Sequence, residues 1–586
     1  MTSGRIMHGR RVRRLAARTL PRPVAERVRE VRRRRRQEAA AARREQRAAE
    51  RRAELLGSDP QVRVVAAGSW EGPGRVVEDF TTDQAREHNL RLVADVLDAE
   101  GVGYFLVRGH SARRCVLGVH LRDRPTVFRA MRARHDLSAV WAVKPGPGGS
   151  AAVACAYVDG GLDSGIKSSM VVRFAEPLVS GSGRVVGGLE FGCDVEFWQD
   201  ADDLLAKESG RRRLDELRSQ TPHRALSGAL VAPRTNRVSD VVPRSAQQPA
   251  VACVGGREVP TFQPFTWTLT EDVSFPVDVV YTWVDGADPT HAARRALYSG
   301  EAPVGLGANA SRYASHDELR YSLRSLHMYA PFVRHVYVVT DDQVPWWLDA
   351  GAEGITVVDH RDIFADPCAL PTFNSHAIEA RLHHIPGLSE HYLYLNDDVF
   401  LGRMRRAEDF FHANGIAQVP FSSAQFGIGD TVEGEVAPNS AGKNVRALFQ
   451  SDFGRGITHK FKHAPHPQIR SVMTELEERY AEVVDRTTRT RFRSTADVAM
   501  AGTMHHHYAL FTGRAVSAQI RMRYVNISSA DAVRRLEQLG ASTSVDSFCL
   551  NDVDTPEGSR EEVQAMVGRF LEERFPFPSP WERRPV

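Results

Sequence analysis

The chain has 586 residues, enough for two to four domains of ordinary size, and its 42% hydrophobic and 8% aromatic content is typical of a soluble globular protein. It has no apolar run near the roughly 18 residues that a membrane span needs, and no secretory leader follows its basic N-terminus. Its six cysteines are scattered and form no C-x-x-C pair, which argues against a zinc site or a disulfide framework and favours a cytoplasmic protein.

The net charge of +4 conceals a strongly basic N-terminus. Residues 1–56 are rich in Arg, Ala, Glu and Gln, which favour helix, and Gly57 to Pro60 end the pattern. This helical or disordered arm is predicted either to be solvated or to lie on an anionic membrane surface, peripherally at its inner face. Nucleic acid is not expected as a partner, because no aromatic side chains interleave the arginines to stack on bases.

Residues 62–220 are predicted to form an α/β accessory domain whose role the sequence does not reveal. The stretch from Gly103 to Gly109 reads as a strand entering a turn, and Asn89 to Glu100 has helical spacing. Residues 221–262 are rich in Pro, Ser, Arg and Gln, a composition that predicts a linker.

Residues 272–580 alternate apolar strands with amphipathic helices, which predicts an α/β, Rossmann-like domain with a mostly parallel sheet. Strands are expected at Val277 to Val284, Val333 to Thr340 and His391 to Leu395, with a helix over Asp317 to Tyr329. In open α/β sheets ligands bind at the carboxyl ends of the strands. Acidic residues follow these three strands, which predicts one shared site: Asp285, Asp341, Asp342, Asp397 and Asp398.

The adjacent pair Asp397 and Asp398 comes directly after a buried strand. Burying two carboxylates is costly unless a cation neutralises them, and oxygen ligands suit Mg²⁺ or Mn²⁺. A divalent cation that carries a nucleotide diphosphate is one interpretation. The other is a strand that ends in a polar turn.

Glu379 lies on a helix predicted from Ser375 to His384, and Asn374 and Ser375 stand at its start. Free N–H groups there could hold phosphate oxygens, although Glu379 could equally face solvent. Arg493 has the guanidinium fork that clamps a diphosphate, but arginine is abundant throughout this chain.

Histidines occur at two further places that could carry chemistry. His463 and His466 flank a proline in a basic segment and could act in acid–base catalysis or contact phosphate, or be incidental. The run from His505 to His507 is similar to a metal-binding tract, yet no acidic partners stand at a defined spacing from it.

Four segments in order resemble the signatures of the Stealth family, and together they cover about half of the chain. The first is Val277 to Gly286, the second runs from Ser311 through Pro331 to Asp398, the third is His463 to His466, and the fourth is Phe548 to Asp552. Stealth proteins are hexose-1-phosphate transferases of bacterial capsule and exopolysaccharide synthesis, related to the alpha/beta subunit of lysosomal-enzyme N-acetylglucosamine-1-phosphotransferase. Some members have Asn at the position of His316 and Met at that of Ala464, and neither change removes a catalytic group.

The resemblance implies an enzyme that transfers hexose-1-phosphate, with N-acetylglucosamine-1-phosphate as the first expectation. The donor would be a UDP-sugar, the acceptor a sugar hydroxyl of a capsular or cell-envelope polysaccharide, and the leaving group UMP. Residues 272–580 would be the catalytic domain. The implied catalytic residues are Glu379, Asp398, His463 and Arg493.

The resemblance also implies a substrate site and a metal site. Mg²⁺ or Mn²⁺ would rest on Asp398, with Asp397 or Asp552 helping, and either Glu379 or His463 would accept the proton of the attacking hydroxyl. Two alternatives stay open: a metal-dependent glycosyltransferase that releases UDP, and a non-catalytic adaptor that works through the basic arm. The expected substrate-binding residues are Asp285, Asn374, Ser375, Arg320 and His466.

Overall fold

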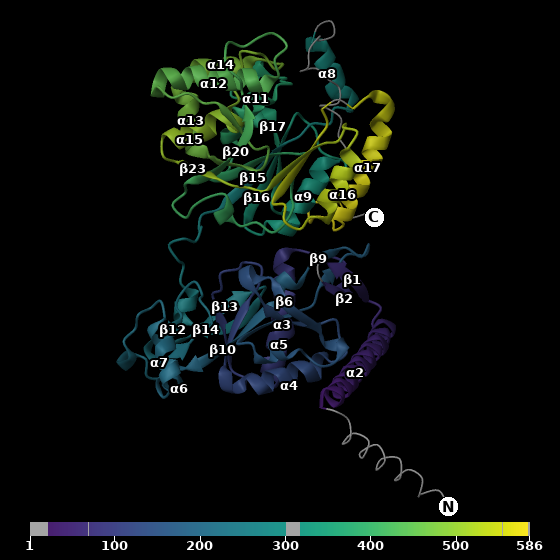
Figure 1. The fold of residues 1–586 in the computed structure, drawn as a ribbon. Helices are drawn as coiled ribbons and strands as arrows, with labels where there is room; N and C mark the ends of the chain where they lie inside the picture. Colours follow the sequence, from purple (N-terminus) through teal and green to yellow (C-terminus); the bar gives the residue numbers. More distant parts are fainter. Residues whose placement is uncertain (1–21, 68–69, 300–316, 554, 584–586) are drawn as a thin grey trace, which may run out of the picture.

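The computed structural model describes residues 22–67, 70–299, 317–553 and 555–583. These residues form a long N-terminal helix, an N-terminal half and a C-terminal half that contact each other (Figure 1). The first 21 residues of the predicted arm and the matched residues Ser311 to Tyr313 and His316 lie outside the described residues.

The predicted arm is helical over its described part. Helix α2 (Arg22–Ser58) has 37 residues, and its last turns pack against the N-terminal half. Arg51 Nε donates to the carbonyl of Val158 at 2.8 Å, Arg52 pairs with Asp159 at 2.6 Å, and Leu55 is buried. The arginine-rich stretch before these residues is exposed to solvent, as far as its side chains are described.

The N-terminal half contains two mixed sheets, a four-stranded one and a ten-stranded one. The first has the order β1 (Val62–Ala67), β2 (Trp70–Val76), β8 (Leu178–Val179) and β9 (Val185–Gly187). The second follows the path β13 (Pro249–Val254), β14 (Arg257–Phe262), β3 (Tyr104–Val107), β4 (Val116–His120), β10 (Cys193–Asp200), β7 (Val171–Ala175), β5 (Trp141–Pro145) and β6 (Ala151–Ala156), with β11 (Leu230–Val231) and β12 (Val241–Val242) attached beside β10. The helices of this half are α3 (Thr82–Ala99), α4 (Arg124–His135), α5 (Ser164–Ser168), α6 (Ala201–Leu205) and α7 (Glu208–Asp215).

Residues 221–262 are not the linker that the sequence predicts. They hold the strands β11 to β14, and β14 joins the sheet through parallel pairing of Thr261 with Leu106. The hairpin β13–β14 lies at the edge of the sheet, where only one face is covered, and along β14 only Val259 and Thr261 are buried. A strand with so few buried positions needs little apolar content, so its composition resembles that of a linker.

The C-terminal half is built on a five-stranded sheet of order β17 (Ile355–Asp359), β16 (Val333–Thr340), β15 (Val277–Thr282), β18 (His391–Asn396) and β22 (His466–Ile469). The first four strands are parallel, and β22 runs antiparallel to β18. Two three-stranded sheets flank it: β19 (Val399–Leu401), β25 (Ser547–Asn551) and β24 (Met522–Asn526), and β21 (His459–Phe461), β20 (Ala417–Gln425) and β23 (Ala515–Ala518). The chain is therefore α/β, but its sheets taken together are mixed.

The helices of the C-terminal half cover these sheets (Figure 1). The predicted helix over residues 317–329 is α9, and the one predicted from Ser375 to His384 is shorter, because α11 ends at Glu379 and a 3₁₀ turn follows. The helices are α8 (Pro289–Ser299), α9 (Glu318–Tyr329), α10 (His360–Ile363), α11 (Ser375–Glu379), α12 (Ala437–Phe453), α13 (Arg470–Arg479), α14 (Ala481–Arg489), α15 (His505–Phe511), α16 (Ala532–Ala541) and α17 (Arg560–Arg574).

The two halves share buried apolar surface. Phe80 is fully buried, and its ring lies 6.5 Å from that of Tyr329 and 6.3 Å from that of Phe577. Arg184 adds a hydrogen bond of 3.1 Å to the carbonyl of Gly540. Among the described residues, no helix combines the length and the apolar character that crossing a bilayer requires.

Candidate active site

A cavity of about 610 Å³ opens where the parallel strands of the C-terminal sheet end. Strand β18 is buried from His391 to Leu395 and delivers Asp397 and Asp398 to this edge, and strand β25 delivers Asn551 and Asp552 beside them. Segments far apart in the sequence therefore meet at one place. The cavity is lined by polar residues that include Glu318, Ser375, Glu379, Tyr394, Asp397, Asp398, His463, His466, Arg493, Asn551 and Asp552.

Asp398 is held by three donors. Its Oδ1 lies 3.2 Å from Nε2 of His463, and its Oδ2 accepts from Sγ of Cys549 at 3.1 Å and from Nδ2 of Asn551 at 3.2 Å. Burial alone would raise the pKa of Asp398, but the charge of His463 and these hydrogen bonds lower it on balance. Asp398 is therefore the ionised partner in this cluster.

His463 is the hydrogen-bond partner of Asp398 in this cluster. Burial alone would lower the pKa of His463, but the carboxylate of Asp398, through its charge and its hydrogen bond, and the charge of Glu379 raise it above the ordinary value. A carboxylate that accepts from one ring nitrogen fixes the tautomer and strengthens the other nitrogen as a base. The arrangement leaves Nδ1 of His463 as the basic atom.

Asp397 is buried close to two other carboxylates. Its burial and the nearby carboxylates of Glu318 and Asp398 raise its pKa well above the ordinary value. Asp552 lines the same cavity and accepts from the amide and hydroxyl of Thr555 through Oδ1 at 2.9 and 2.8 Å. Neighbouring carboxylates of this kind could hold a hard divalent cation, which prefers oxygen ligands.

Glu379 stands at the end of α11, facing the carboxyl end of β18. Tyr394 Oη donates to Oε1 of Glu379 at 3.4 Å, and Tyr394 is itself 3.1 Å from the hydroxyl of Thr282. Burial raises the pKa of Glu379, although the charges of His376 and Arg493 act against this. A carboxyl group tuned in this way can exchange a proton nearer to neutral pH than a solvated one.

Arg493 reaches the cavity from the loop after α14. Its Nη2 donates to the hydroxyl of Ser375, the first residue of α11, at 2.7 Å. Both residues also line a second cavity of about 170 Å³, which adjoins the first and extends toward Trp283 and Asp341 at the ends of β15 and β16. Because the guanidinium of Arg493 lines both cavities, it could bind an anionic ligand that extends from one cavity into the other.

A chain of buried histidines leads from a backbone amide to the cavity. The amide of Ile469 donates to Nε2 of His505 at 2.9 Å, Nδ1 of His505 is 3.1 Å from Nδ1 of His506, and Nε2 of His506 is 2.9 Å from Nδ1 of His466. Burial, with the charges of neighbouring groups, lowers the pKa of His466 and of His505 to about 3 and that of His506 well below 6.5. All three rings are therefore neutral near pH 7.

The backbone amide sets the direction of this chain, because an N–H group can only donate. His505 accepts on Nε2, so its proton is on Nδ1 and is donated to His506. His506 then carries its proton on Nε2 and donates it to Nδ1 of His466. The Nε2–H of His466, a residue that lines the cavity, is left as a donor for a bound ligand.

Three residues expected to bind substrate do not line either cavity. Arg320 pairs with Glu582 at 2.6 Å, and the side chain of Asp285 accepts from the amide of Ala287 at 2.9 Å in the turn after β15. Asn374 is fully buried as the N-cap of α11, and its Nδ2 donates to Asp497 at 2.9 Å. Each of these side chains holds the fold together near the site.

The other expected residues are brought together. Both cavities share Ser375, Asp397 and Arg493, and the larger one holds the remaining predicted residues, Glu379, Asp398, His463, His466 and Asp552. Cys549, Asn551 and Tyr394 were not predicted individually, although Cys549 and Asn551 belong to the fourth matched segment. Burial and the charge of Asp398 raise the pKa of Cys549 well above its ordinary value, so it remains a thiol that donates.

The conserved regions of one family match most of the C-terminal half. Stealth protein conserved region 1 matches residues 275–302, region 2 matches 312–419, region 3 matches 462–510 and region 4 matches 540–586. Exopolysaccharide phosphotransferase SCO6023 of Streptomyces coelicolor is 43% identical over 501 residues, which cover 85% of this chain and 83% of that one. The chain belongs to the Stealth family. It is accordingly an enzyme, a phosphotransferase.

Similarity to other proteins extends beyond the conserved Stealth regions. Exopolysaccharide phosphotransferase CpsY of Mycobacterium tuberculosis is 33% identical over 512 residues, 87% of this chain and 90% of that one, so the match to these Stealth relatives includes most of the N-terminal half. Among solved structures, galactosyltransferase LgtC in complex with donor and acceptor sugar analogues covers 52% of this chain and 97% of its own, at 11% identity and a TM-score of 0.26.

Proposed function

We propose that this Stealth protein transfers a hexose-1-phosphate, N-acetylglucosamine-1-phosphate in the first instance, from a UDP-sugar to a hydroxyl group of an exopolysaccharide and releases UMP. One observation carries the proposal: Asp398 and His463, which are hydrogen-bonded to each other, line the same cavity as Arg493 and Glu379. Phosphoryl transfer to a hydroxyl needs a base for the hydroxyl proton and a cationic side chain that binds the phosphate groups, and His463 and Arg493 are suited to these roles. Glu379 adds a carboxyl group with a raised pKa. The names of the relatives supply the polymer class.

The acidic residues fit a divalent cation, Mg²⁺ or Mn²⁺. Burial and the nearby carboxylates of Glu318 and Asp398 raise the pKa of Asp397 strongly, and a bound cation would stabilise its ionised form. The oxygens of Asp398 already accept three hydrogen bonds, so Asp397 and Asp552 would carry much of the ligation and Asp398 the rest. When bound, the cation would neutralise the diphosphate and the charge that develops on the leaving UMP.

The proton of the acceptor hydroxyl goes to Nδ1 of His463 in this proposal. Asp398 accepts from Nε2 of the same ring and stabilises the imidazolium that forms. The hydroxyl oxygen bonds to the β-phosphorus of the donor as the bond from that phosphorus to the bridging oxygen breaks. The electron pair of the broken bond leaves on the phosphate of UMP, and the product is a phosphodiester.

Arg493 and His466 are proposed to hold the group in transfer. The guanidinium of Arg493 lies between the two cavities and suits the diphosphate, and the Nε2–H of His466 suits a phosphoryl or sugar oxygen. Glu379 is proposed to orient a hydroxyl of the transferred sugar. The smaller cavity, with Trp283, would take the nucleoside.

The exposed arginines of α2 suit an anionic membrane surface, and peripheral attachment through residues 1–56 remains a prediction. Binding of the purified protein to vesicles with and without phosphatidylglycerol tests it. This attachment is separate from the chemistry of the cavity.

The test of the proposed reaction is the identity of the nucleotide product. The purified protein is incubated with UDP-N-acetylglucosamine, Mg²⁺ or Mn²⁺ and short glycans, and the nucleotides are separated by chromatography. Acceptor-dependent UMP is expected. Acceptor-dependent UDP would overturn the proposal in favour of a glycosyltransferase, because UDP is released only when the sugar–phosphate bond breaks.

A further inference from the structure

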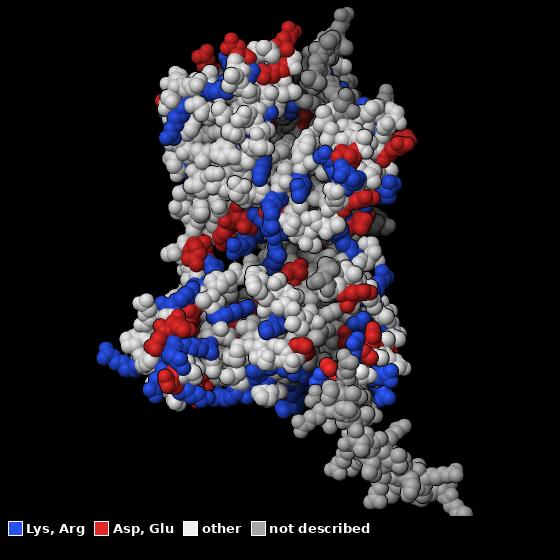
Figure 2. Space-filling view, in the orientation of Figure 1, with Lys and Arg blue, Asp and Glu red and all other residues white. Residues whose placement is uncertain are grey.

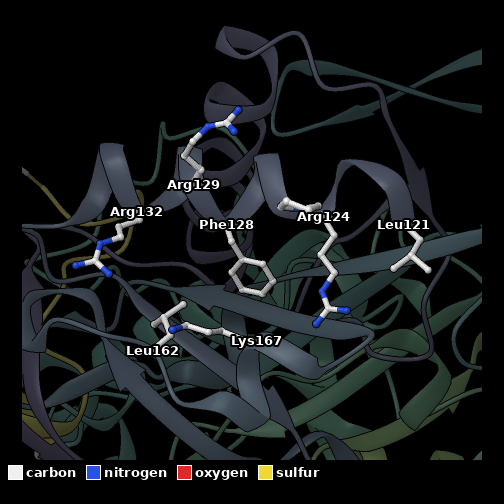
Figure 3. A pocket seen from close by; sticks show the side chains of 8 residues that line it. Leu121, Arg124, Phe128, Arg129, Arg132, Leu162 and Lys167 are labelled. Carbon is white, nitrogen blue, oxygen red and sulfur yellow. The ribbon is translucent and has the colours of Figure 1, made fainter.

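A basic groove lies on the N-terminal half, away from the catalytic cavity. Helix α4 and the segment around α5 enclose a hollow of about 600 Å³ (Figure 3). In Figure 1, α4 covers the side of the N-terminal half that faces away from the C-terminal half. The α4 groove, as it is called below, is lined by Leu121, Arg124, Pro125, Phe128, Arg129, Arg132, Leu162 and Lys167.

The α4 groove combines an apolar floor with positive walls. The ring of Phe128 lies near its centre, with Leu162 and Lys167 across from it and Arg124 and Arg132 on either side (Figure 3). No carboxylate is among the residues that line it, within the part of the chain that the structure describes. The groove therefore offers a surface for stacking together with several charges of one sign.

Arg124 is fixed in place without an acidic partner among the described residues. Its guanidinium carbon lies 5.8 Å from the ring centre of Phe128 and 5.4 Å from that of Phe197. Stacking on two rings orders the guanidinium and leaves its N–H groups free to bind an anion. Arg132 is 3.5 Å from Asp136, but that carboxylate also pairs with Arg51 at 2.9 Å, so Arg132 is only partly neutralised.

The ligand that fits this groove carries negative charges at intervals along a backbone with flat, weakly polar faces. A chain of sugars joined by phosphodiesters has both features, because pyranose rings pack on aromatic rings and phosphates match guanidinium groups. A lipid headgroup lacks the faces that Phe128 could contact. A nucleic acid has bases and phosphates, but it is not a substrate or product of the proposed reaction.

We propose that the α4 groove binds the phosphodiester-linked glycan that this enzyme extends. The inference rests on the proposed function, which supplies a polyanionic polymer as acceptor and product. A second attachment point away from the cavity raises the effective concentration of the growing chain at the catalytic site. Long acceptors then bind more tightly than short ones, although the chemistry at their ends is the same.

Binding is tested without donor, using the full-length protein and a labelled synthetic hexamer of N-acetylglucosamine joined by phosphodiesters. Fluorescence anisotropy is measured for the wild type and for the double variant Arg132→Gln/Lys167→Gln, which keeps Asp136 paired with Arg51. The variant is expected to lose affinity about 10-fold or more, since two charged contacts disappear. Adding Arg124→Gln to the double variant is expected to lower the affinity for the hexamer further.

The matched control removes the same charge elsewhere. Arg134 on α4 and Arg212 on α7 are exposed and do not line the groove, so Arg134→Gln/Arg212→Gln is expected to bind within about twofold of wild type. Equal affinity of Arg132→Gln/Lys167→Gln and wild type for the phosphodiester hexamer would overturn the proposal. Wild-type protein that binds the neutral hexamer chitohexaose as tightly as the phosphodiester hexamer would also overturn it. So would groove-dependent binding of oligodeoxythymidine or phosphatidylglycerol vesicles in place of the glycan.

Turnover separates this proposal from the proposed reaction. With a short soluble acceptor, Arg132→Gln/Lys167→Gln is expected to release UMP at the wild-type kcat, whereas its KM for long phosphodiester glycans rises. A wild-type protein that releases no UMP refutes the reaction. Normal UMP release together with an unchanged KM for long glycans in the variant refutes the groove alone.

Discussion

Two buried acidic sites, one in each half of the chain, have opposite charge environments. In the N-terminal half, Asp194 is fully buried, and Arg173 and Arg234 pair with it at 2.7 and 2.8 Å. Burial alone would raise the pKa of Asp194, but these guanidinium groups lower it on balance. In the C-terminal half, Asp397 and Asp398 stand together and the pKa of Asp397 is raised. A buried carboxylate that guanidinium groups neutralise has a structural role, whereas neighbouring buried carboxylates with a raised pKa indicate a candidate ligand site.

Asp398→Asn is expected to have the largest effect on activity. The change removes the carboxylate that orients His463 and helps to hold a cation, so UMP release should fall at least about 10³-fold. The free energy of unfolding should fall only modestly, by roughly 1 to 2 kcal/mol, because the charge-assisted hydrogen bond between His463 and Asp398 is lost. Product chromatography and urea unfolding measure the two quantities, and a variant that retains activity would remove Asp398 from the catalytic group.

Asp194→Asn should show the opposite pattern and is the natural counterpart. It leaves the buried guanidinium of Arg173 without its charge partner, so the free energy of unfolding should fall by about 3 to 5 kcal/mol. Well below the unfolding temperature, kcat should stay near the wild-type value. Thermal unfolding and initial rates measured on the same preparation decide whether the contrast between the halves holds, and a large loss of kcat in the folded variant would break it.

Removal of the metal should lower the thermal stability only where the acidic residues of the catalytic cavity are intact. At a Mg²⁺ concentration 100 times its dissociation constant, binding to the folded state alone adds about 2.7 kcal/mol to the stability. Thermal unfolding with EDTA and after addition of Mg²⁺ should therefore show a shift in the wild type and in Asp194→Asn. The double variant Asp397→Asn/Asp552→Asn should not respond, and a response equal to wild type would place the cation elsewhere.

The histidine chain predicts the smallest effect. His506→Phe interrupts the hydrogen bonds that fix the proton of His466, and kcat should fall about 10-fold, as it does when an orienting contact is lost. His506→Gln can accept from His505 through oxygen and donate to His466 through nitrogen, so it should recover most of the loss. Equal rates for the two variants would show that His506 acts only through packing.

Much of the C-terminal sheet could be predicted from the sequence, because apolar runs and the acidic residues after them mark strand ends. The strand from Val333 to Thr340 and the helix that ends at Tyr329 agree with the sequence-based boundaries. The position of Asp397 and Asp398 in the cavity also follows from pattern, since both come after a buried strand, whereas Asp552 was expected only through the resemblance to the family. Strand ends and their charges are local features that a single sequence displays.

Contacts between distant segments could not be predicted in this way. Nothing near Arg320 indicates that Glu582 is its partner, and nothing near Asn374 reveals Asp497. The run from His505 to His507, which is similar to a metal-binding tract, contributes His505 and His506 to a hydrogen-bonded chain, because the backbone amide of Ile469 on β22 donates to His505. The edge hairpin at 249–262 was predicted as part of a linker, because one of its faces is exposed and its sequence therefore has few apolar residues.

The position of Glu582 has a consequence for how the protein is made. Its carboxylate binds Arg324 of α9 across 258 residues of sequence, and the ring of Phe577 covers Phe80 of the N-terminal half. A ribosome adds roughly 5 to 20 residues each second, so α9 waits many seconds for the last piece of its surroundings. Until then Phe80 and the buried arginine of α9 lack their final neighbours. The nascent chain therefore completes this part of its fold only after residue 582 has been added, and a chaperone that shields apolar surface would act before that point.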